Sequence, residues 1–218
     1  MTNLGSTFGA SSTGLVFDAA YALHDPGPGH PESPDRYRAL HLALSSSGLL
    51  DRLSRVPVRE ATDDDLHLCH TRAYLATVRH DMARRAATLS TGDTARGAHT
   101  EAVARLAAGA AMAGVDAVMT GREHNVFVAA RPPGHHATLS RGMGFCVYNN
   151  VALAARYARK AYGVDRILIA DWDVHHGNGT QDIFYEDPSV FFFSTHQSPW
   201  YPGTGAASET GAAAGKAR

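Results

Sequence analysis

One stretch of the sequence, DWDVHHGNG (171–179), places ionisable side chains at a spacing suited to metal chemistry. It follows the apolar run RILIA (166–170), so Asp171, Asp173 and His175 would share one face if the chain stays extended. Ionisable groups at the end of a buried strand are costly unless something compensates them. Carboxylate and imidazole ligands suit zinc, and a catalytic zinc normally takes three protein ligands. The motif therefore predicts part of a metal site that needs a ligand from elsewhere.

A second motif, RPPGHHA (131–137), places His135 and His136 directly after the apolar run NVFVAA (125–130). A histidine pair alone is an ordinary feature of surface loops, and an isolated DxDxH could simply cap a helix. Here each motif follows its own buried strand. This combination favours one shared site with acid–base and metal-binding groups over two unrelated polar loops.

The elements that must position these motifs predict an α/β fold. We expect strands at 14–18, 125–130, 166–170 and 189–194, each apolar on both faces and separated by helices. This pattern is typical of a parallel sheet covered on both sides. Open α/β sheets bind ligands at the carboxyl ends of their strands, so the segments after these strands should converge there.

The helices are expected at 34–48, 62–85, 100–121 and 149–163. Pro34 and Asp35 are typical of a helix start, and Thr62 is a plausible N-cap before acidic residues. We expect residues 1–13 to be a disordered tail and residues 14–218 to form a single domain.

Composition limits the classes of function. The 218 residues are 44% hydrophobic with a formal net charge of −1, which gives no electrostatic reason to expect nucleic acid or an anionic membrane as partner. No apolar stretch approaches the roughly 20 residues that span a bilayer, and the N-terminus lacks the pattern of a signal peptide. Cys69 and Cys146 form no paired framework. We therefore expect a cytoplasmic protein with two core thiols.

Four ordered motifs resemble the zinc-dependent histone deacetylase and acetylpolyamine amidohydrolase superfamily, which has an arginase-like three-layer αβα fold with a mostly parallel sheet. They are GHPESPDRYRAL, RPPGHHA with GMGFCVYNNVALAARYA, DWDVHHGNGTQDIFY and PWYPGTG. HPES and HQSPWYPGTG look like the class II and bacterial deacetylase-like members. Asn178 stands where the class I enzymes have an aspartate.

The resemblance implies a catalytic role for four residues. His136 matches the general base that accepts a proton from the attacking water and then protonates the leaving amine. His135 matches the second histidine of the pair, hydrogen-bonded to Asp171. Asn178 would orient His136 without adding a charge, which leaves the pKa of that base lower than an aspartate partner would.

The resemblance also implies metal sites. Asp173 and His175 match two zinc ligands, with ferrous iron as the alternative metal. His176 fits a packing role better than a ligand role. A structural potassium ion would be held by carbonyls or side chains at five positions: Asp171, Asp173, His175, Ser194 and Thr195.

For the substrate, the resemblance implies an acetylated lysine side chain or an acetylated small amine or polyamine. Phe145, beside Gly144, and Tyr201 match the aromatic walls of a narrow apolar slot that suits a methylene chain. Asp93 matches a rim carboxylate that binds the substrate backbone. Arg36 is either part of an internal pocket for acetate release or an ordinary surface arginine.

Two parts of the family pattern, an aspartate as third zinc ligand and a tyrosine in a Gly-Gly-Tyr setting, follow PGTG and do not occur in this chain. We therefore expect an incomplete domain, about its first two-thirds, whose strand edge near VFFF is open to oligomerisation. The alternative to a deacetylase is an inactive fragment with weak metal or partner binding. An arginase-like manganese hydrolase is disfavoured because its aspartate-rich motifs are absent.

Overall fold

The strands pair in parallel, as the apolar runs predict. The computed structural model describes residues 12–216. In the first sheet, β1 (Thr13–Val16) pairs with β2 (Ser54–Arg55) and with β3 (Asn125–Val128). In the second, β4 (Ile167–Asp171) pairs with β5 (Val190–Ser194). The predicted disorder of residues 1–11 falls outside the described residues, and Thr13 is already part of a strand.

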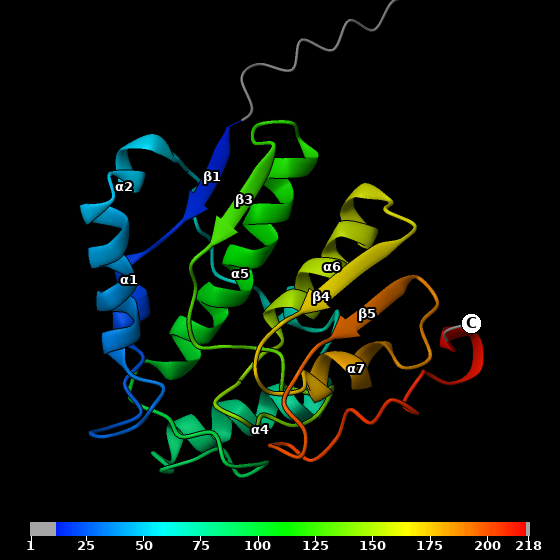
Figure 1. Cartoon of the computed structure of the whole chain (residues 1–218). Coiled ribbons are helices and arrows are strands. Elements are labelled where there is room, and N and C mark those ends of the chain that lie inside the picture. The colour runs from blue at the N-terminus through cyan, green and yellow to red at the C-terminus, as the bar shows by residue number, and fades with distance from the viewer. Residues whose placement is uncertain (1–11, 217–218) are drawn as a thin grey trace, which may run out of the picture.

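Helices lie between and after these strands (Figure 1). They are η1 (Ala19–Leu23), α1 (Pro34–Ser46), α2 (Leu49–Arg52), α3 (Asp63–Leu66), α4 (Arg72–Ala83), α5 (Thr100–Met119), α6 (Asn150–Tyr162), α7 (Asn178–Phe184) and η2 (Ala213–Gly215). The sequence analysis did not predict β2, α2 or α7.

The helix expected at 62–85 is wrong as a single helix, because α3 and α4 are separate. Thr62 does cap α3, with its hydroxyl accepting from the Asp65 N–H at 3.1 Å in a capping box. A second cap lies at Thr71, whose hydroxyl accepts from the Tyr74 N–H at 3.1 Å and begins α4. The chain therefore turns between the two helices at the second threonine.

Helices cover both faces of the first sheet. Along β1, Val16 packs with Val103 and Ala107 of α5 on one face. Leu15 faces the other way, in a cluster with Leu44 of α1. Alternate burial of this kind follows from the period of two of a strand and gives a three-layer arrangement.

The second sheet is covered on one face only. Ile169 of β4 and Val190 of β5 pack in the same buried cluster as Leu153 of α6 and Phe184 of α7. The opposite face, which shows no helix over it in Figure 1, carries exposed apolar side chains. The most exposed are Leu168 at 65%, Phe191 at 56% and Phe193 at 51%. The prediction that these strands are buried on both faces is wrong for the described residues.

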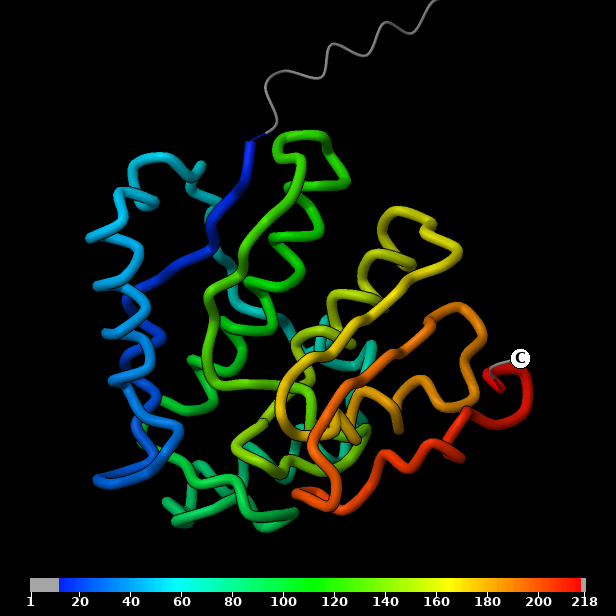
Figure 2. Tube along the Cα trace, viewed as in Figure 1, coloured from blue at the N-terminus to red at the C-terminus, as the bar shows by residue number. Residues whose placement is uncertain are grey.

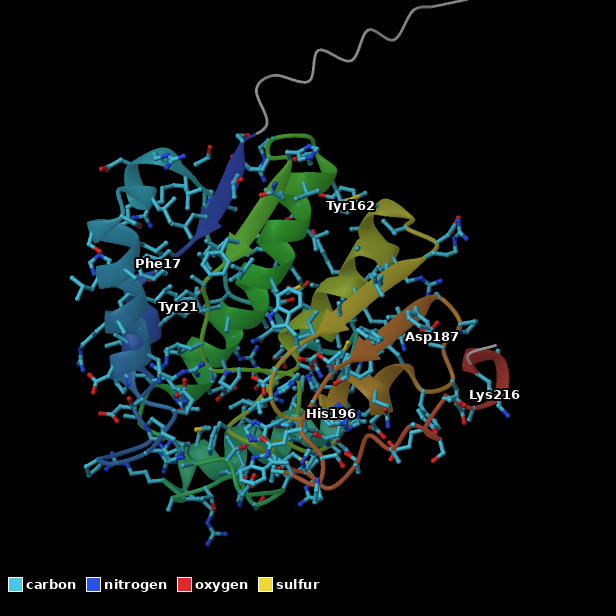
Figure 3. The ribbon with its side chains drawn as sticks, viewed as in Figure 1. Phe17, Tyr21, Tyr162, Asp187, His196 and Lys216 are labelled. Atoms are coloured by element: carbon cyan, nitrogen blue, oxygen red, sulfur yellow. The ribbon has the colours of Figure 1, made fainter. Side chains whose placement is uncertain are left out.

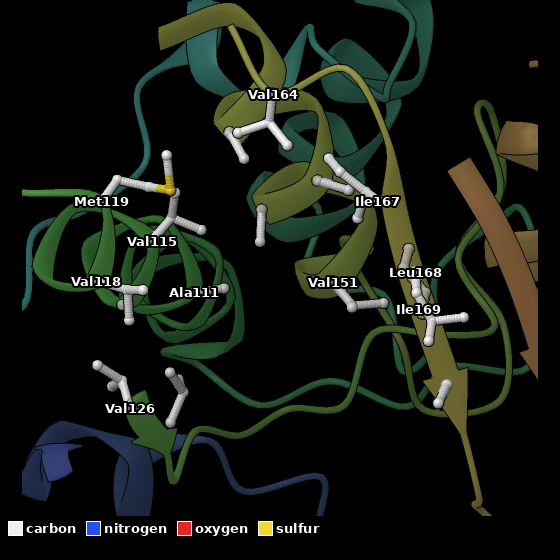
Figure 4. Close-up of a pocket in the computed structure, with 16 residues that line it drawn as sticks. Ala111, Val115, Val118, Met119, Val126, Val151, Val164, Ile167, Leu168 and Ile169 are labelled. Atoms are coloured by element: carbon white, nitrogen blue, oxygen red, sulfur yellow. The ribbon is translucent and has the colours of Figure 1, made fainter. Parts of the chain in front are cut away.

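An apolar gap separates β3 from β4, with a volume of about 480 Å³ (Figure 4). The side chains of Val126 and Val128 line one side and those of Ile167 and Ile169 the other. The two sheets share no ladder in the described residues, so the contact between α5 and α6 joins them.

Helix α5 corrects the expectation that no apolar stretch of this sequence approaches the length needed to span a bilayer. Its 20 residues, Thr100–Met119, are long and apolar enough to cross a membrane by length and composition alone. In the structure more than half of it is buried, and it packs against α6, β1 and β3. Its apolar composition is therefore accounted for by its position in the core.

Candidate active site

The segments that follow β3, β4 and β5 meet at one edge of the molecule, near α4 (Figures 1 and 2). Between them lies a cavity of about 410 Å³. It is lined by residues from every motif that the sequence analysis selected, namely Pro31, Glu32, Arg36, Asp93, Pro133, His135, His136, Gly144, Phe145, Asp173, His175 and Tyr201. Parallel strands present their carboxyl ends on the same side, which explains why motifs so distant in sequence converge.

His135 and Asp171 form the first contact of the site. Asp171 is the last residue of β4, and its Oδ2 lies 2.8 Å from His135 Nδ1. The other carboxylate oxygen accepts from the Asp173 N–H at 3.1 Å. A carboxylate held in this way favours a proton on His135 Nδ1 and leaves Nε2 facing away from Asp171.

His136 has a different environment from its neighbour. It is buried, and its Nδ1 lies 2.8 Å from Asn178 Oδ1 at the start of α7. Burial, and then the adjacent His135 imidazole at 4.0 Å between ring centroids, lower the pKa of His136 to about 4. The hydrogen bond to Asn178 acts in the opposite direction on that pKa. His136 is thus neutral near pH 7, with Nε2 able to accept a proton.

Asp173 and His175 lie next to each other in the cavity, with Oδ1 and Nδ1 3.1 Å apart. Burial raises the pKa of Asp173, but the His175 N–H and the neighbouring imidazoles outweigh it, so that pKa lies below its ordinary value. One carboxylate and one imidazole are donors of the type zinc takes. In the part of the chain that the structure describes, no three His, Cys, Asp or Glu side chains form a metal-binding group. The fit to zinc is therefore right in donor type and one ligand short.

The rim of the cavity is organised around Asp93. Its carboxylate accepts from the Gly144 N–H at 2.7 Å and from the Tyr201 hydroxyl at 3.2 Å. Gly144 has a φ of +55°, and a Cβ there would lie 2.3 Å from the His136 ring. Only glycine meets both conditions, so Gly144 allows the chain to pass directly over the His136 imidazole.

Two aromatic rings stand at this rim. Tyr201 is edge-on to His136, with ring centroids 5.1 Å apart and planes at 88°. Phe145 has a φ of +68°, which is rare for a bulky residue, and His30 packs edge-on against it at 4.7 Å. The aromatic residues predicted to form a slot are thus brought to the same opening.

The residues predicted to hold potassium lie near one another. Asp171 and Ser194 are partners in the β4–β5 register, and the Thr195 N–H donates to the Asp171 carbonyl at 3.0 Å. The Ser194 hydroxyl lies 3.0 Å from His196 Nδ1. These groups already have protein partners, so their role toward a cation stays a prediction.

A buried ion pair beneath the cavity was missed by the sequence analysis. Arg131 makes two hydrogen bonds to the carboxylate of Glu32, one of them at 2.9 Å, and His24 Nε2 lies 3.1 Å from that carboxylate. Burial raises the pKa of Glu32, but His24 and Arg131 outweigh it and lower that pKa to about 2. Arg36 also contacts Glu32, at 3.2 Å, and lines the cavity. The only signal in the sequence was that Glu32, Arg36 and Arg131 belong to the selected motifs GHPESPDRYRAL and RPPGHHA.

Residues 30–218 match the family model for the histone deacetylase domain. The chain belongs to the histone deacetylase family. It is 40% identical to histone deacetylase 15 of Arabidopsis thaliana over 220 residues, covering 97% of this chain and 40% of the plant protein. It is 47% identical to the polyamine deacetylase HDAC10 of Rattus norvegicus over 171 residues, covering 76% of this chain and 29% of the rat protein.

The structure also has the fold of a histone deacetylase domain. The structure matches the crystal structure of the HDA15 HD domain with a TM-score of 0.89 at 40% identity. That match covers 95% of this chain and 61% of the solved chain. The uncharacterized protein slr0245 of Synechocystis sp. is 44% identical over 200 residues, covering 90% of this chain and 65% of that protein. The chain therefore spans less than two-thirds of the length of each of these relatives.

Proposed function

We propose that the protein carrying this domain is a zinc-dependent amidohydrolase that removes acetyl groups from acetyl-lysine or acetylated amines. The observation that carries the proposal is the pairing of two imidazoles with different partners, Asp171 and Asn178, in one cavity. Asp173 and His175 lie in the same cavity. The names of the relatives, which include a polyamine deacetylase, support an acetylated amine as the substrate class.

His136 is the proposed general base. Its low pKa keeps it neutral, and the contact from Nδ1 to Asn178 directs Nε2 toward the cavity. It takes a proton from the attacking water at Nε2 and returns it to the leaving amine. His135 is the proposed second imidazole of the pair, and its contact with the Asp171 carboxylate at 2.8 Å holds the ring in place.

Asp173 and His175 are the proposed metal ligands, and their third partner belongs to the part of the family domain that this chain does not span. Zinc bound there would act as a Lewis acid and make water a nucleophile at neutral pH. The nearby positions of Asp171, Ser194 and Thr195 support a separate structural potassium site as a second proposal.

Phe145 and Tyr201 are the proposed walls of the substrate slot, and Asp93 the group that binds the substrate backbone. An aromatic opening excludes water from an alkyl stem and leaves the amide at the paired imidazoles. Asp93 has a second task in this proposal, because it already holds Gly144 and Tyr201 in place.

One observation favours the alternative that the 218 residues taken alone form an inactive fragment. Two zinc ligands without a third would bind metal weakly and leave it open to solvent. We therefore propose that this segment by itself is inactive, whereas the protein that contains a complete domain is active.

The test compares residues 1–218 with a version extended through the remainder of the family domain. Both are assayed on an acetyl-lysine peptide and an acetylated polyamine with added zinc, with and without a hydroxamate. We expect turnover and hydroxamate inhibition only in the extended version. Hydrolysis of guanidino compounds alone, or equal turnover by both versions, would contradict the proposal.

A further inference from the structure

A closed ring of hydrogen bonds lies beside the candidate site. The Thr204 hydroxyl donates to His176 Nδ1 at 2.8 Å, and His176 Nε2 donates to Gln181 Oε1 at 3.0 Å. The Gln181 amide donates to Glu209 Oε2 at 2.5 Å. The ring closes where Glu209 Oε1 accepts from the Gly205 N–H at 3.0 Å. Every polar atom of the His176 and Gln181 side chains faces a partner in this arrangement.

The ring fixes one segment of chain onto two imidazoles, those of the buried His176 and the half-buried His196. Gly205 has a φ of +92°, and a Cβ there would lie 2.4 Å from His196 Nε2 and 2.7 Å from the His176 ring. The Gly205 carbonyl also lies 3.1 Å from His196 Nε2. His196 follows β5 at the lower end of that strand in Figure 3, on the side of the molecule where the site lies. The segment at 204–206 therefore has little freedom to move away.

The segment that the ring holds also carries Tyr201. Three residues before Thr204, the Tyr201 ring stands edge-on to His136 and His175, at 5.1 Å and 6.0 Å between centroids. Apart from these ring contacts, Tyr201 is tied by a single side-chain hydrogen bond, to Asp93, among the described residues. The position of this ring thus depends on what holds the chain just after it.

We propose that the hydrogen-bonded ring is a positioning device for the substrate slot. Gln181 and Glu209 are positioning residues: they touch no reacting atom, but through Thr204 and Gly205 they hold Tyr201 over the site. The catalytic consequence rests on the proposed function, whereas the effect on the segment itself does not.

The ring offers a charge-swap test. Gln181→Glu places a carboxylate against that of Glu209 and opens the ring. The double variant Gln181→Glu with Glu209→Gln restores one carboxylate and one amide and should close it again. Glu209→Gln alone is the isosteric control. In this variant the new amide can donate to Gln181 Oε1, the Gln181 amide can donate to His176 Nε2, and the other tautomer of His176 can donate from Nδ1 to the Thr204 hydroxyl, so the ring stays closed.

The readout uses the two tryptophans of the sequence, Trp172 and Trp200. In a Trp172→Phe background, Trp200 is the single reporter and lies next to Tyr201. In the chain of residues 1–218, Gln181→Glu should lower the fluorescence anisotropy of Trp200 and raise its acrylamide quenching. The double variant should return both to the parent values. Unchanged anisotropy in Gln181→Glu, or a double variant that stays as mobile as the single one, would overturn the proposal.

Two further measurements separate the outcomes. If circular dichroism shows that Gln181→Glu has unfolded, Gln181→Leu opens the ring without adding charge and takes its place. In the extended, active protein, the ring-opening variant should raise KM for the acetyl-lysine peptide by about tenfold with kcat nearly unchanged. Absence of activity in the parent protein would contradict the proposed function, while the fluorescence would still decide the role of the ring. A fall in kcat with unchanged KM would show that the ring does not act through the slot.

Discussion

The adjacent side chains of His135 and His136 have different environments in this structure because their hydrogen-bond partners differ. His135 Nδ1 faces the Asp171 carboxylate at 2.8 Å. His136 faces the neutral amide of Asn178 and is more deeply buried. Pairs of titratable groups with opposed environments are typical of acid–base sites. Burial, and then the adjacent His135 imidazole, lower the pKa of His136, so the two rings are not equivalent.

Replacing His136 tests its role in the extended enzyme. His136→Ala should lower kcat by roughly 10²–10⁴-fold, because it removes a proton-transfer group. It should leave the zinc content unchanged, because it removes no ligand. The measurement is steady-state turnover together with metal analysis of the purified variant. Asp173→Ala is the matched comparison, since it should release zinc. Stoichiometric loss of zinc from His136→Ala would contradict the assignment.

His70 predicts an acid-sensitive fold. Its Nδ1 donates to the Thr138 carbonyl at 2.9 Å, and its Nε2 accepts from the Asn149 N–H at 3.0 Å, which fixes a neutral ring. Burial lowers the pKa of His70 to about 4 from its ordinary 6.5. As the pH falls, His70 therefore takes up a proton at a higher pH in the unfolded chain than in the folded chain. The stabilisation from neutral His70 is complete above pH 6.5 and is lost as the pH falls toward 4.

Urea unfolding at pH 7 and pH 4.5 checks this prediction in the parent chain and in His70→Gln. The parent should lose about 2–3 kcal/mol more unfolding free energy than the variant over this range, because one pKa unit corresponds to about 1.4 kcal/mol. The comparison cancels the contribution of His136, whose pKa is also lowered. Equal pH dependence in both proteins would remove His70 as the cause.

At the scale of elements, the second threonine cap separates α3 from α4. Thr71→Ala removes the acceptor for the Tyr74 N–H and should lower the free energy of unfolding by about 0.5–2 kcal/mol. Thr77→Ala is the control on the same helix, where the hydroxyl only bonds the Ala73 carbonyl and alanine has the better helix propensity. Thermal and urea denaturation measure both. A larger loss in Thr77→Ala than in Thr71→Ala would contradict the role of the cap.

The elements that could be predicted are those whose apolar pattern decides them locally. The runs that became β3, β4 and β5 are apolar enough to be predicted as strands from their own residues. The two-residue strand β2 and the polar start of α7 have no such pattern and depend on contacts with the rest of the fold. Phe191 and Leu168 are apolar whether or not a layer covers them, so their exposure could not be predicted.

Within the site, the motifs predicted which residues meet, but not what supports them. The contacts His135–Asp171 and His136–Asn178 are those that the family resemblance implied. Glu32 and Arg131 are 99 residues apart, and no local pattern links them. Gln181 and Glu209 are likewise ordinary polar residues in the sequence, and only the folded chain brings them together.

At the scale of the whole molecule, the uncovered face of β4 and β5 predicts self-association of this chain. Contiguous exposed apolar side chains on a sheet promote contact with another chain. Phe191→Lys should reduce the association of residues 1–218, measured by light scattering during size-exclusion chromatography over a range of concentrations. Leu42→Lys is the control, because Leu42 is 70% exposed but lies on α1, away from this face. Equal effects of the two variants would contradict a specific role for the face.

The gap between β3 and β4 has a mechanical consequence for the contact between His135 and Asp171. His135 follows β3 and Asp171 ends β4, so their hydrogen bond joins the two sheets across the gap. The distance between the sheets is set by the seam of α5 and α6, where small residues such as Ala108 and Ala155 are buried in the same cluster. A softer seam would let the sheets move apart and weaken the imidazole–carboxylate contact, while each sheet kept its own ladder. We therefore expect the packing of α5 against α6, two helices that contribute no side chain to the candidate active-site cavity, to control how constantly His135 and Asp171 stay in contact.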